Sequence, residues 1–290
     1  MRIATWNVNS LHARLEKVKW WLERAKPDVL LMQETKLSDA DAPVGIFREI
    51  GYNLAHHGEG RWNGVAIASR HGIEGMVTNF GEPLRRPATS DVADDEPLAE
   101  ARMLAAVCGG VRVVSLYAPN GRTVGSPYYR AKLQWFDRLA RWLEEAVDPR
   151  DAVVLGGDFN VAPEDADVWD PRACHGGTHV SPLEREAFSR LCRWGLSDAY
   201  RLHHKEHARY TWWDYRAGNF HKNFGMRIDH LLVTAPLRER VLWAEIDREA
   251  RKGKPIPSDH APLVIDIDEH GHSFDAGWKS AEARIAARLK

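Results

Sequence analysis

Cysteine is scarce in this 290-residue sequence, which contains three, at Cys108, Cys174 and Cys192. Their odd number and irregular spacing argue against a disulfide framework and against a structural zinc site. Long apolar runs are also missing, and the first residues resemble neither a secretory signal nor a transit peptide. We therefore expect a cytoplasmic protein that keeps its cysteines reduced and does not associate with a membrane.

An excess of either charge sign is lacking as well. Lys and Arg total 40, Asp and Glu total 41, and the formal net charge is −1. A surface that binds nucleic acid must therefore come from uneven placement of charge on the fold. Hydrophobic residues make up 44% of the sequence, which is close to the globular average and sufficient for a sizeable core.

Strand-like segments recur along the whole sequence. They are rich in Val, Ile and Leu, and turn-forming Gly, Pro, Asn or Asp residues bound them. Apolar residues three and four positions apart predict helices at Leu11–Ala25, Pro127–Val147 and Pro182–Trp194. Ser181, directly before Pro182, is predicted to cap the third helix. The predicted strands are Arg2–Val8, Asp28–Met32, Val65–Ser69, Arg102–Val107, Val111–Tyr117, Ala152–Leu155, His230–Thr234 and Leu263–Ile267.

The order of these elements favours an α/β sandwich, in which helices cover the outer faces of two packed sheets. Strands often follow one another directly, and no Gly-x-Gly-x-x-Gly motif follows the first, so a doubly wound nucleotide-binding sheet is disfavoured. We expect one catalytic domain over residues 1–267 and a C-terminal appendage over residues 268–290. The proline-containing, acidic segment Gly81–Glu100 is expected to be an exposed loop.

Polar residues stand at the ends of many predicted strands. Gly-Asp or Ser-Asp-His alone would usually form an ordinary turn, but the combination, in one chain, predicts a shared site at one sheet edge. These strand-end residues are Asn7, Glu34, Tyr117, Asn120, Asp158, Asn160, Asp229, Asp259 and His260.

The residue types at these positions suit metal-assisted cleavage of a phosphate ester. Glu34 offers a hard oxygen ligand for Mg²⁺ or Mn²⁺, whereas the sequence offers no His-x-x-x-His or Cys cluster for a softer metal. Asn7, Tyr117 and Asn160 are neutral donors that can bind phosphate oxygens without repelling them. An aligned water and a proton acceptor complete the requirements of this reaction.

Two assignments of the proton acceptor remain open. Asp229 can hold His260 in one tautomer and raise its pKa, which would make His260 an imidazolium and leave Asp158 to accept the proton from water. Alternatively, His260 is itself the base. We favour Asp158, because a paired histidine close to a phosphate tends to stay protonated.

Several motifs occur together over residues 1–267 and resemble, in their order, the exonuclease III family of abasic-site DNA endonucleases. The strand-end motifs are shared with the wider endonuclease/exonuclease/phosphatase superfamily, whereas the segment Tyr210–Asp229 is similar to the DNA-repair branch. The motifs are Gln33-Glu34-Thr35-Lys36, Asn63-Gly64-Val65-Ala66-Ile67, Tyr117-Ala118-Pro119-Asn120-Gly121, Gly156-Gly157-Asp158-Phe159-Asn160, Thr211-Trp212-Trp213-Asp214-Tyr215, Arg227-Ile228-Asp229 and Ser258-Asp259-His260.

The resemblance implies a four-layer, DNase I-like α/β sandwich, with two facing mixed sheets flanked by helices. It implies Mg²⁺-dependent hydrolysis of the DNA backbone 5′ to abasic sites, leaving a 3′-hydroxyl, with Mn²⁺ as a substitute metal. It also implies 3′→5′ exonuclease and 3′-phosphatase activity. The implied partner is double-stranded DNA with abasic sites or blocked 3′ ends, and we expect the enzyme to be a monomer.

The family roles can be carried over to matching positions. Glu34 would be the principal metal ligand, with Asn7 and Asp259 beside the metal. Asp158 would orient or deprotonate the water, and Asp229 would support His260. Tyr117 and Asn160 would hold the phosphate and Asn120 would bind the substrate, while Trp212, Met226 and Ile228 would form the wall of a pocket for a baseless sugar.

Two other functions are weighed against this one. A less specific nuclease or phosphodiesterase of the superfamily would share the strand-end motifs. A catalytically silent DNA-binding module is disfavoured, because Glu34, Asp158 and His260 are all present. At least one of Trp212 and Trp213 is expected in the core. Some of the basic residues near the motifs are expected to form a rim that contacts phosphates, namely Arg61, Arg122, His221, Lys222, Lys252 and Lys254.

Overall fold

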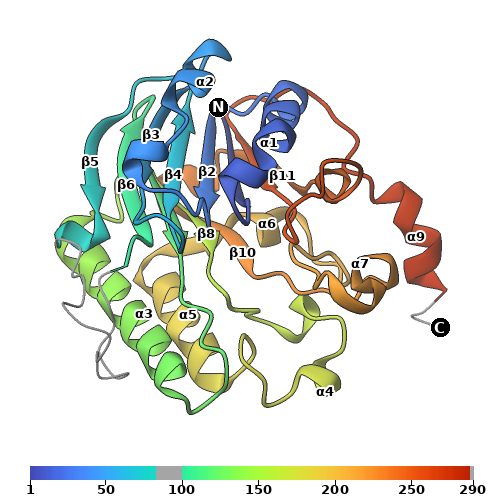
Figure 1. Cartoon of the computed structure of the whole chain (residues 1–290). Helices are drawn as coiled ribbons and strands as arrows, with labels where there is room; N and C mark the ends of the chain where they lie inside the picture. The colour runs from blue at the N-terminus through green and yellow to red at the C-terminus, as the bar shows by residue number, and fades with distance from the viewer. Residues whose placement is uncertain (83–99, 288–290) are drawn as a thin grey trace.

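Two six-stranded sheets form the centre of the computed structural model, which describes residues 1–82 and 100–287 (Figure 1). The strand order is β11-β12-β1-β2-β4-β3 in the first sheet and β5-β6-β7-β8-β10-β9 in the second. Neighbouring strands are parallel in the pairs β1–β2 and β7–β8 and antiparallel in the remaining pairs of the described chain. The strands are β1 (Arg2–Asn7), β2 (Val29–Gln33), β3 (Asn53–His57), β4 (Val65–Ser69), β5 (Glu74–Thr78), β6 (Met103–Cys108), β7 (Val111–Tyr117), β8 (Val153–Asp158), β9 (Leu196–Asp198), β10 (Asp229–Thr234), β11 (Val241–Ile246) and β12 (Leu263–Ile267).

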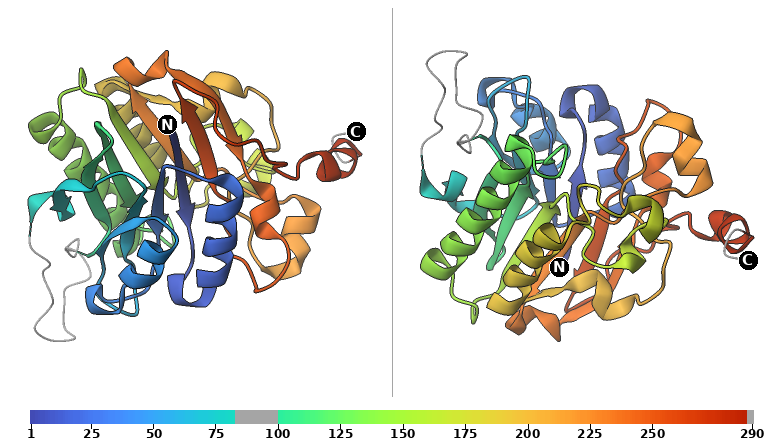
Figure 2. Two further views of the ribbon diagram at one scale, coloured as in Figure 1. Left: turned by 90° about the horizontal axis from the view of Figure 1, so that it is seen from above. Right: turned by 90° about the horizontal axis from the view of Figure 1, so that it is seen from below.

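Helices cover the outer face of each sheet, and this arrangement confirms the predicted four-layer sandwich. In β1, Ile3 packs into the core between the sheets, whereas the next residue, Ala4, packs with Trp21 of α1 (Leu11–Ala25) on the other face. The helices α3 (Pro127–Ala146) and α5 (Pro182–Trp194) cover the second sheet. Figure 2 shows α1 and α3 on opposite sides of the strands.

The long helices begin and end close to the predicted residues. Ser181 caps α5 as predicted: its side chain accepts from the N–H of Glu184, and Glu184 reaches back to the Ser181 N–H. Proline occupies the first position of α5, where no N–H donor is needed. Shorter helices that the sequence did not predict are α2 (Val44–Glu49), α4 (Pro171–Cys174), α6 (Ala199–His203), α7 (Asn219–Lys222) and α8 (Ala235–Arg238).

The eight predicted strands are the eight inner strands of the two sheets. The four strands that sequence analysis missed, β3, β5, β9 and β11, are the four sheet edges. Of these, β3 and β5 carry polar residues and β9 has three residues, so they lack the apolar runs that mark inner strands. β11 reads Val-Leu-Trp-Ala-Glu-Ile and was missed despite its apolar residues. One inner strand is longer than predicted, because β8 continues through Gly156 and Gly157 to Asp158.

Close approach of the two sheets explains why glycine occurs in the middle of β8. A Cβ atom on Gly156 would lie 2.5 Å from Leu31 Cδ1 and 2.7 Å from Leu231 Cδ2. Close by, the buried Gln33 side chain of β2 donates to the Ser115 hydroxyl of β7 at 3.0 Å. Satisfied buried hydrogen bonds of this kind fix how one sheet lies on the other.

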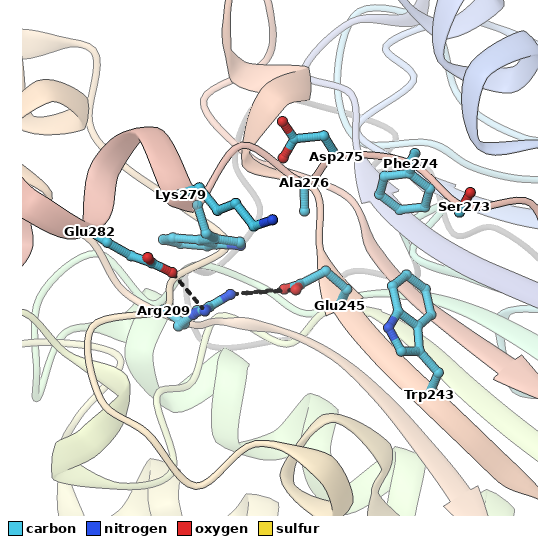
Figure 3. A pocket seen from close by; sticks show the side chains of 10 residues that line it. Arg209, Trp243, Glu245, Ser273, Phe274, Asp275, Ala276, Lys279 and Glu282 are labelled. Carbon is cyan, nitrogen blue, oxygen red and sulfur yellow. Dashed lines mark hydrogen bonds and ion pairs between the residues drawn. The ribbon is translucent and has the colours of Figure 1, made fainter.

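The C-terminal segment packs against the edge strand β11. Trp278 is buried, and its indole N–H donates to the Ile246 carbonyl oxygen at 2.7 Å, directly before α9 (Lys279–Ala286). Figure 3 shows a cavity of about 590 Å³ between this segment and β11, where Arg209 pairs with Glu245 and Glu282. The division of the chain near residue 267 stays a prediction.

The predicted exposed loop Gly81–Glu100 lies for the most part outside the described residues. Over residues 1–82 and 100–287, no helix combines the length and the hydrophobicity of a membrane-spanning segment.

Candidate active site

The predicted site residues gather where the central strands end. Asn7 ends β1, and Glu34 follows β2 directly. In the second sheet, Asp158 of β8 is paired in register with Tyr117 of β7 and with Asp229 of β10. Since β10 runs antiparallel to β8, its first residue lies at the same end of the sheet as the last residue of β8.

Asn7 connects the two sheets at this end. Its buried side-chain amide donates to Glu34 Oε1 and to Asp158 Oδ2, both at 2.9 Å. The Asn7 carbonyl oxygen Oδ1 in turn accepts from the Asn9 backbone N–H at 3.0 Å, which fixes the orientation of the amide. The neutral side chain of Asn7 therefore holds together the carboxylates of Glu34 and Asp158, which belong to different sheets.

His260 and Asp229 form the predicted pair. His260 Nδ1 lies 2.8 Å from Asp229 Oδ2, and Nε2 lies 3.8 Å from Asp158 Oδ2. Burial alone would lower the pKa of His260, but the carboxylates of Asp229 and Asp158 raise it to about 10. Ser258 supports this geometry. Its hydroxyl accepts from the backbone N–H of His260 and donates to the backbone carbonyl oxygen of Asn7. The contacts with Asp229 and Asp158 therefore favour the protonated form of His260.

The pKa of Asp158 differs from that of an exposed aspartate. Burial raises its pKa to about 7, against the attraction of protonated His260. Its second oxygen, Oδ1, accepts from the Asn160 backbone N–H at 2.9 Å. A carboxyl group whose pKa lies near neutrality can accept a proton at physiological pH and release it again.

Ligand atoms of Glu34, Asp158 and His260 lie within 4.8 Å of one another and could hold a metal ion. His260 Nδ1 is engaged by Asp229, and the two carboxylates supply oxygen donors of the kind that a hard divalent cation prefers. Burial would raise the pKa of Glu34, but Lys36, at 2.9 Å from Oε2, holds it below the ordinary value. Glu34 is therefore ionised and ready to bind a cation.

Asp259 is engaged on both carboxylate oxygens. Oδ1 accepts from the Asn9 side-chain amide at 2.9 Å, and Oδ2 accepts from the Trp212 indole N–H at 3.1 Å. Lys36 Nζ donates to the Asn9 side chain at 2.6 Å. Because Lys36 also pairs with Glu34, the side chains of Lys36 and Asn9 link Glu34 to Asp259. Sequence analysis did not assign roles to Asn9 and Lys36, although both lie next to residues that it did select.

Tyr117 and Asn160, predicted to hold the phosphate, and Asn120, predicted to bind the substrate, lie around Asp158. The Tyr117 hydroxyl contacts Glu34, and burial, followed by the Glu34 charge, raises the pKa of Tyr117, so the hydroxyl keeps its proton. The Asn120 side-chain amide donates to Asn160 Oδ1 at 3.2 Å, and the Asn160 amide donates to the Ala118 carbonyl oxygen. Arg102, which sequence analysis missed, lies over the Tyr117 ring at 4.7 Å.

A buried ion pair behind Asn120 and Asn160 also escaped sequence analysis. Lys132 Nζ donates to the Asn160 and Asn120 carbonyl oxygens, at 2.7 and 3.4 Å, and to Glu184. Both side chains of the Lys132–Glu184 pair are fully buried. The His179 ring lies 2.6 Å from the same Asn160 oxygen, and burial lowers its pKa to about 4. The sequence did contain a signal for this buried lysine. Lys132 lies three residues from both Tyr129 and Trp135, which places it on the apolar face of the predicted helix.

Trp212, Met226 and Ile228 lie together, and their role as a pocket wall stays a prediction. They pack in one small apolar cluster with Val168, and backbone bridges join Trp212 to Met226 and to His260. Trp213 is fully buried in the main core, which confirms that at least one of the two tryptophans has a packing role.

The residues of the predicted basic rim are mostly exposed. Arg61, Arg122, His221, Lys222 and Lys254 face solvent, and Lys252 is half-buried and pairs with Glu249. Contact with DNA by this rim stays a prediction.

Comparison with known proteins extends these observations. Residues 4–260 match the endonuclease/exonuclease/phosphatase family model. The chain is 31% identical over 273 residues to exodeoxyribonuclease III of Haemophilus influenzae, covering 91% of this chain and 98% of that protein. It is 30% identical to exodeoxyribonuclease of Bacillus subtilis, covering 92% and 100%.

Solved structures agree with these matches. An AP endonuclease from Archaeoglobus fulgidus superposes with a TM-score of 0.84 at 37% identity, covering 93% of this chain and all of that one. The 3′ phosphatase NExo from Neisseria, bound to a product DNA hairpin, superposes with a TM-score of 0.83 at 38% identity and the same coverage. The chain therefore belongs to the endonuclease/exonuclease/phosphatase family, and within it to the exonuclease III group of DNA-repair nucleases.

Proposed function

We propose that this nuclease hydrolyses the DNA backbone 5′ to abasic sites in a Mg²⁺-dependent reaction and leaves a 3′-hydroxyl. We further propose that it removes nucleotides and phosphates from 3′ ends and acts as a monomer on double-stranded DNA. Relatives named as exodeoxyribonuclease III, AP endonuclease and 3′ phosphatase support these activities. The observation that carries the proposal is the placement of Asp158 between the Asp229–His260 pair and the Asn7–Glu34 pair.

Glu34 is the proposed principal ligand of Mg²⁺, with Mn²⁺ as a substitute, and Asn7 and Asp259 lie beside the ion. When bound, the metal would offset the negative charge of the phosphate. Ionised Glu34 provides the hard oxygen that such a cation prefers. Lys36 competes for Glu34 Oε2 and keeps the carboxylate oriented until the ion binds.

Asp158 is the proposed proton acceptor for the attacking water. Its raised pKa matches that role, and imidazolium His260 on the neighbouring side is suited to stabilise the negative phosphate. Tyr117 and Asn160 are proposed to donate to the phosphate oxygens, and Asn120 to bind the substrate beside them. Trp212, Met226 and Ile228 are proposed to line the pocket that receives the baseless sugar.

A cleavage assay with paired substrates tests this function. A duplex with one tetrahydrofuran abasic analogue should be nicked about 10²-fold or more faster than the intact duplex, because extruding a base costs a few kcal/mol that a baseless sugar avoids. EDTA should abolish the nicking of both. Equal rates on the two duplexes would favour a less specific nuclease, and stoichiometric binding without turnover in Mg²⁺ would favour a silent DNA-binding module.

Glu34→Ala should impair cleavage at low Mg²⁺ more than at high Mg²⁺. The substitution removes an ionised ligand, so a higher metal concentration is needed to fill the site. Titration of the nicking rate with Mg²⁺ measures this effect, and Glu16→Ala on the exposed part of α1 is the matched control. A loss of rate that is the same at every Mg²⁺ concentration would contradict the ligand role of Glu34.

A further inference from the structure

An aromatic pair, with Trp169 exposed and Phe224 half-buried, lies next to the proposed sugar pocket. The rings of Trp169 and Phe224 stack at 4.1 Å with an interplanar angle of 21°. Trp169 is 37% exposed, and Lys222 Nζ lies 5.9 Å from the Phe224 ring centroid. All three residues line a cavity of about 380 Å³. We call Trp169, Phe224 and Lys222 the aromatic platform.

The segments that form the proposed sugar pocket also hold the platform in place. The Trp169 N–H donates to the Gly225 carbonyl oxygen at 3.0 Å, between Phe224 and the pocket residue Met226. Gly225 packs closely against the backbone of Trp212, since a Cβ atom on Gly225 would lie 2.6 Å from the Trp212 carbonyl oxygen. The platform is therefore built on the same backbone as the pocket wall and keeps a fixed position relative to it.

The platform lies a few nucleotides away from the proposed reaction centre. Backbone bridges join His260 to Trp212, Trp212 to Met226, and Met226 to Val168, which directly precedes Trp169. Paired strands lie ~4.8 Å apart, so three such steps span at most roughly 14 Å. Successive nucleotides of one DNA strand are ~3.4 Å apart along the helix axis, which makes this span about four nucleotides.

We propose that the aromatic platform stacks an unpaired DNA base that lies within about four nucleotides of the cleaved phosphate. The half-exposed indole of Trp169 offers a flat surface that accepts any base, and Lys222 supplies positive charge for the backbone. Asp170 also lines the cavity. Its Oδ1 accepts hydrogen bonds from the backbone N–H groups of Arg172 and Ala173 and so caps α4.

This inference rests on the proposed function, because it concerns the DNA held in the same site. It deepens that function by naming a second recognition element. The enzyme would grip DNA whose strands have separated near the lesion or at a frayed 3′ end more tightly than fully paired DNA.

Trp169→Ala should weaken binding to a duplex whose bases two to five nucleotides from the abasic analogue are mismatched, by about 10-fold, since stacking contributes at this scale. Binding to the fully paired abasic duplex should change little. Fluorescence anisotropy of labelled DNA in EDTA measures both affinities without cleavage. Trp169→Phe should keep most of the preference, and Trp20→Ala, which removes an equally exposed tryptophan from α1, is the control.

Equal losses of affinity on the two duplexes, or no loss on either, would overturn the platform as a base-stacking site. Thermal unfolding of each variant identifies any loss that comes from misfolding, and preserved preference in Trp169→Phe supports stacking in particular. Because the readout is binding in EDTA, it is separate from the cleavage assay. A wild-type protein that prefers mismatched DNA through Trp169 but fails to cut abasic DNA would support the platform and contradict the proposed function.

Discussion

Asp158→Asn should lower the single-turnover rate of abasic-site cleavage by about 10²-fold or more, the scale of losing a catalytic proton acceptor. The amide keeps the size of the side chain but cannot accept the proton of the attacking water. Because the pKa of Asp158 is raised to about 7, the wild-type rate should increase as pH rises towards and through neutrality, when the carboxylate loses its proton. A bound cation favours the carboxylate and moves this rise to lower pH.

The Asn variant should lose this pH-dependent rise and bind abasic DNA about as well as the wild type. Asp148→Asn, at an exposed turn after α3, is a control that changes the same functional group away from the site. A rate for Asp158→Asn close to that of the wild type would remove Asp158 from the mechanism. His260 would then be the remaining candidate for the base.

Lys132→Met should destabilise the fold by about 3–5 kcal/mol, the usual cost of removing one partner from a buried ion pair. The substitution leaves the Glu184 carboxylate buried without its ammonium partner, and the Asn120 and Asn160 carbonyl oxygens lose a donor. Urea unfolding followed by circular dichroism measures the change in the free energy of unfolding.

A second substitution tests the cause of that loss. Adding Glu184→Leu to Lys132→Met should recover part of the stability, since it removes the unpaired buried charge. Recovery should be incomplete, because Glu184 also completes the cap of α5. Arg150→Met, at an exposed ion pair, should leave the urea midpoint unchanged. Wild-type stability of Lys132→Met alone would contradict a structural role of the pair.

The inner strands of both sheets could be predicted from the sequence because burial on both faces produces an apolar run. Of the edge strands, β11 has apolar residues that could have been recognised, whereas β3 and β5 could not be predicted. β3 reads Asn-Leu-Ala-His-His, and β5 begins with Glu74 and Gly75, so neither has the composition of a buried strand. The end of β8 was also hidden, since glycine usually interrupts strands, and Gly156 is explained by the neighbouring side chains of Leu31 and Leu231, which come from other parts of the sequence.

The site was predictable where its residues follow strands directly. Asn7, Glu34 and Asp158 stand at such positions, and their separation in sequence did not matter, because strand ends meet at one sheet edge. The supporting contacts were not predictable in the same way. Lys132 and Glu184 are 52 residues apart and lie on two different helices, so their pairing depends on how α3 and α5 pack.

Asn7 joins carboxylates from the two sheets, and this has a consequence for the protein during its synthesis. The first sheet needs β12 beside β1, and His260 lies only a few residues before β12, so the last part of the domain to leave the ribosome completes the centre. A nascent chain that lacks this part has neither His260 nor the Ser258 hydroxyl that donates to the Asn7 backbone oxygen. The proposed nuclease would therefore stay harmless to DNA until the residues up to His260 and β12 have been synthesised.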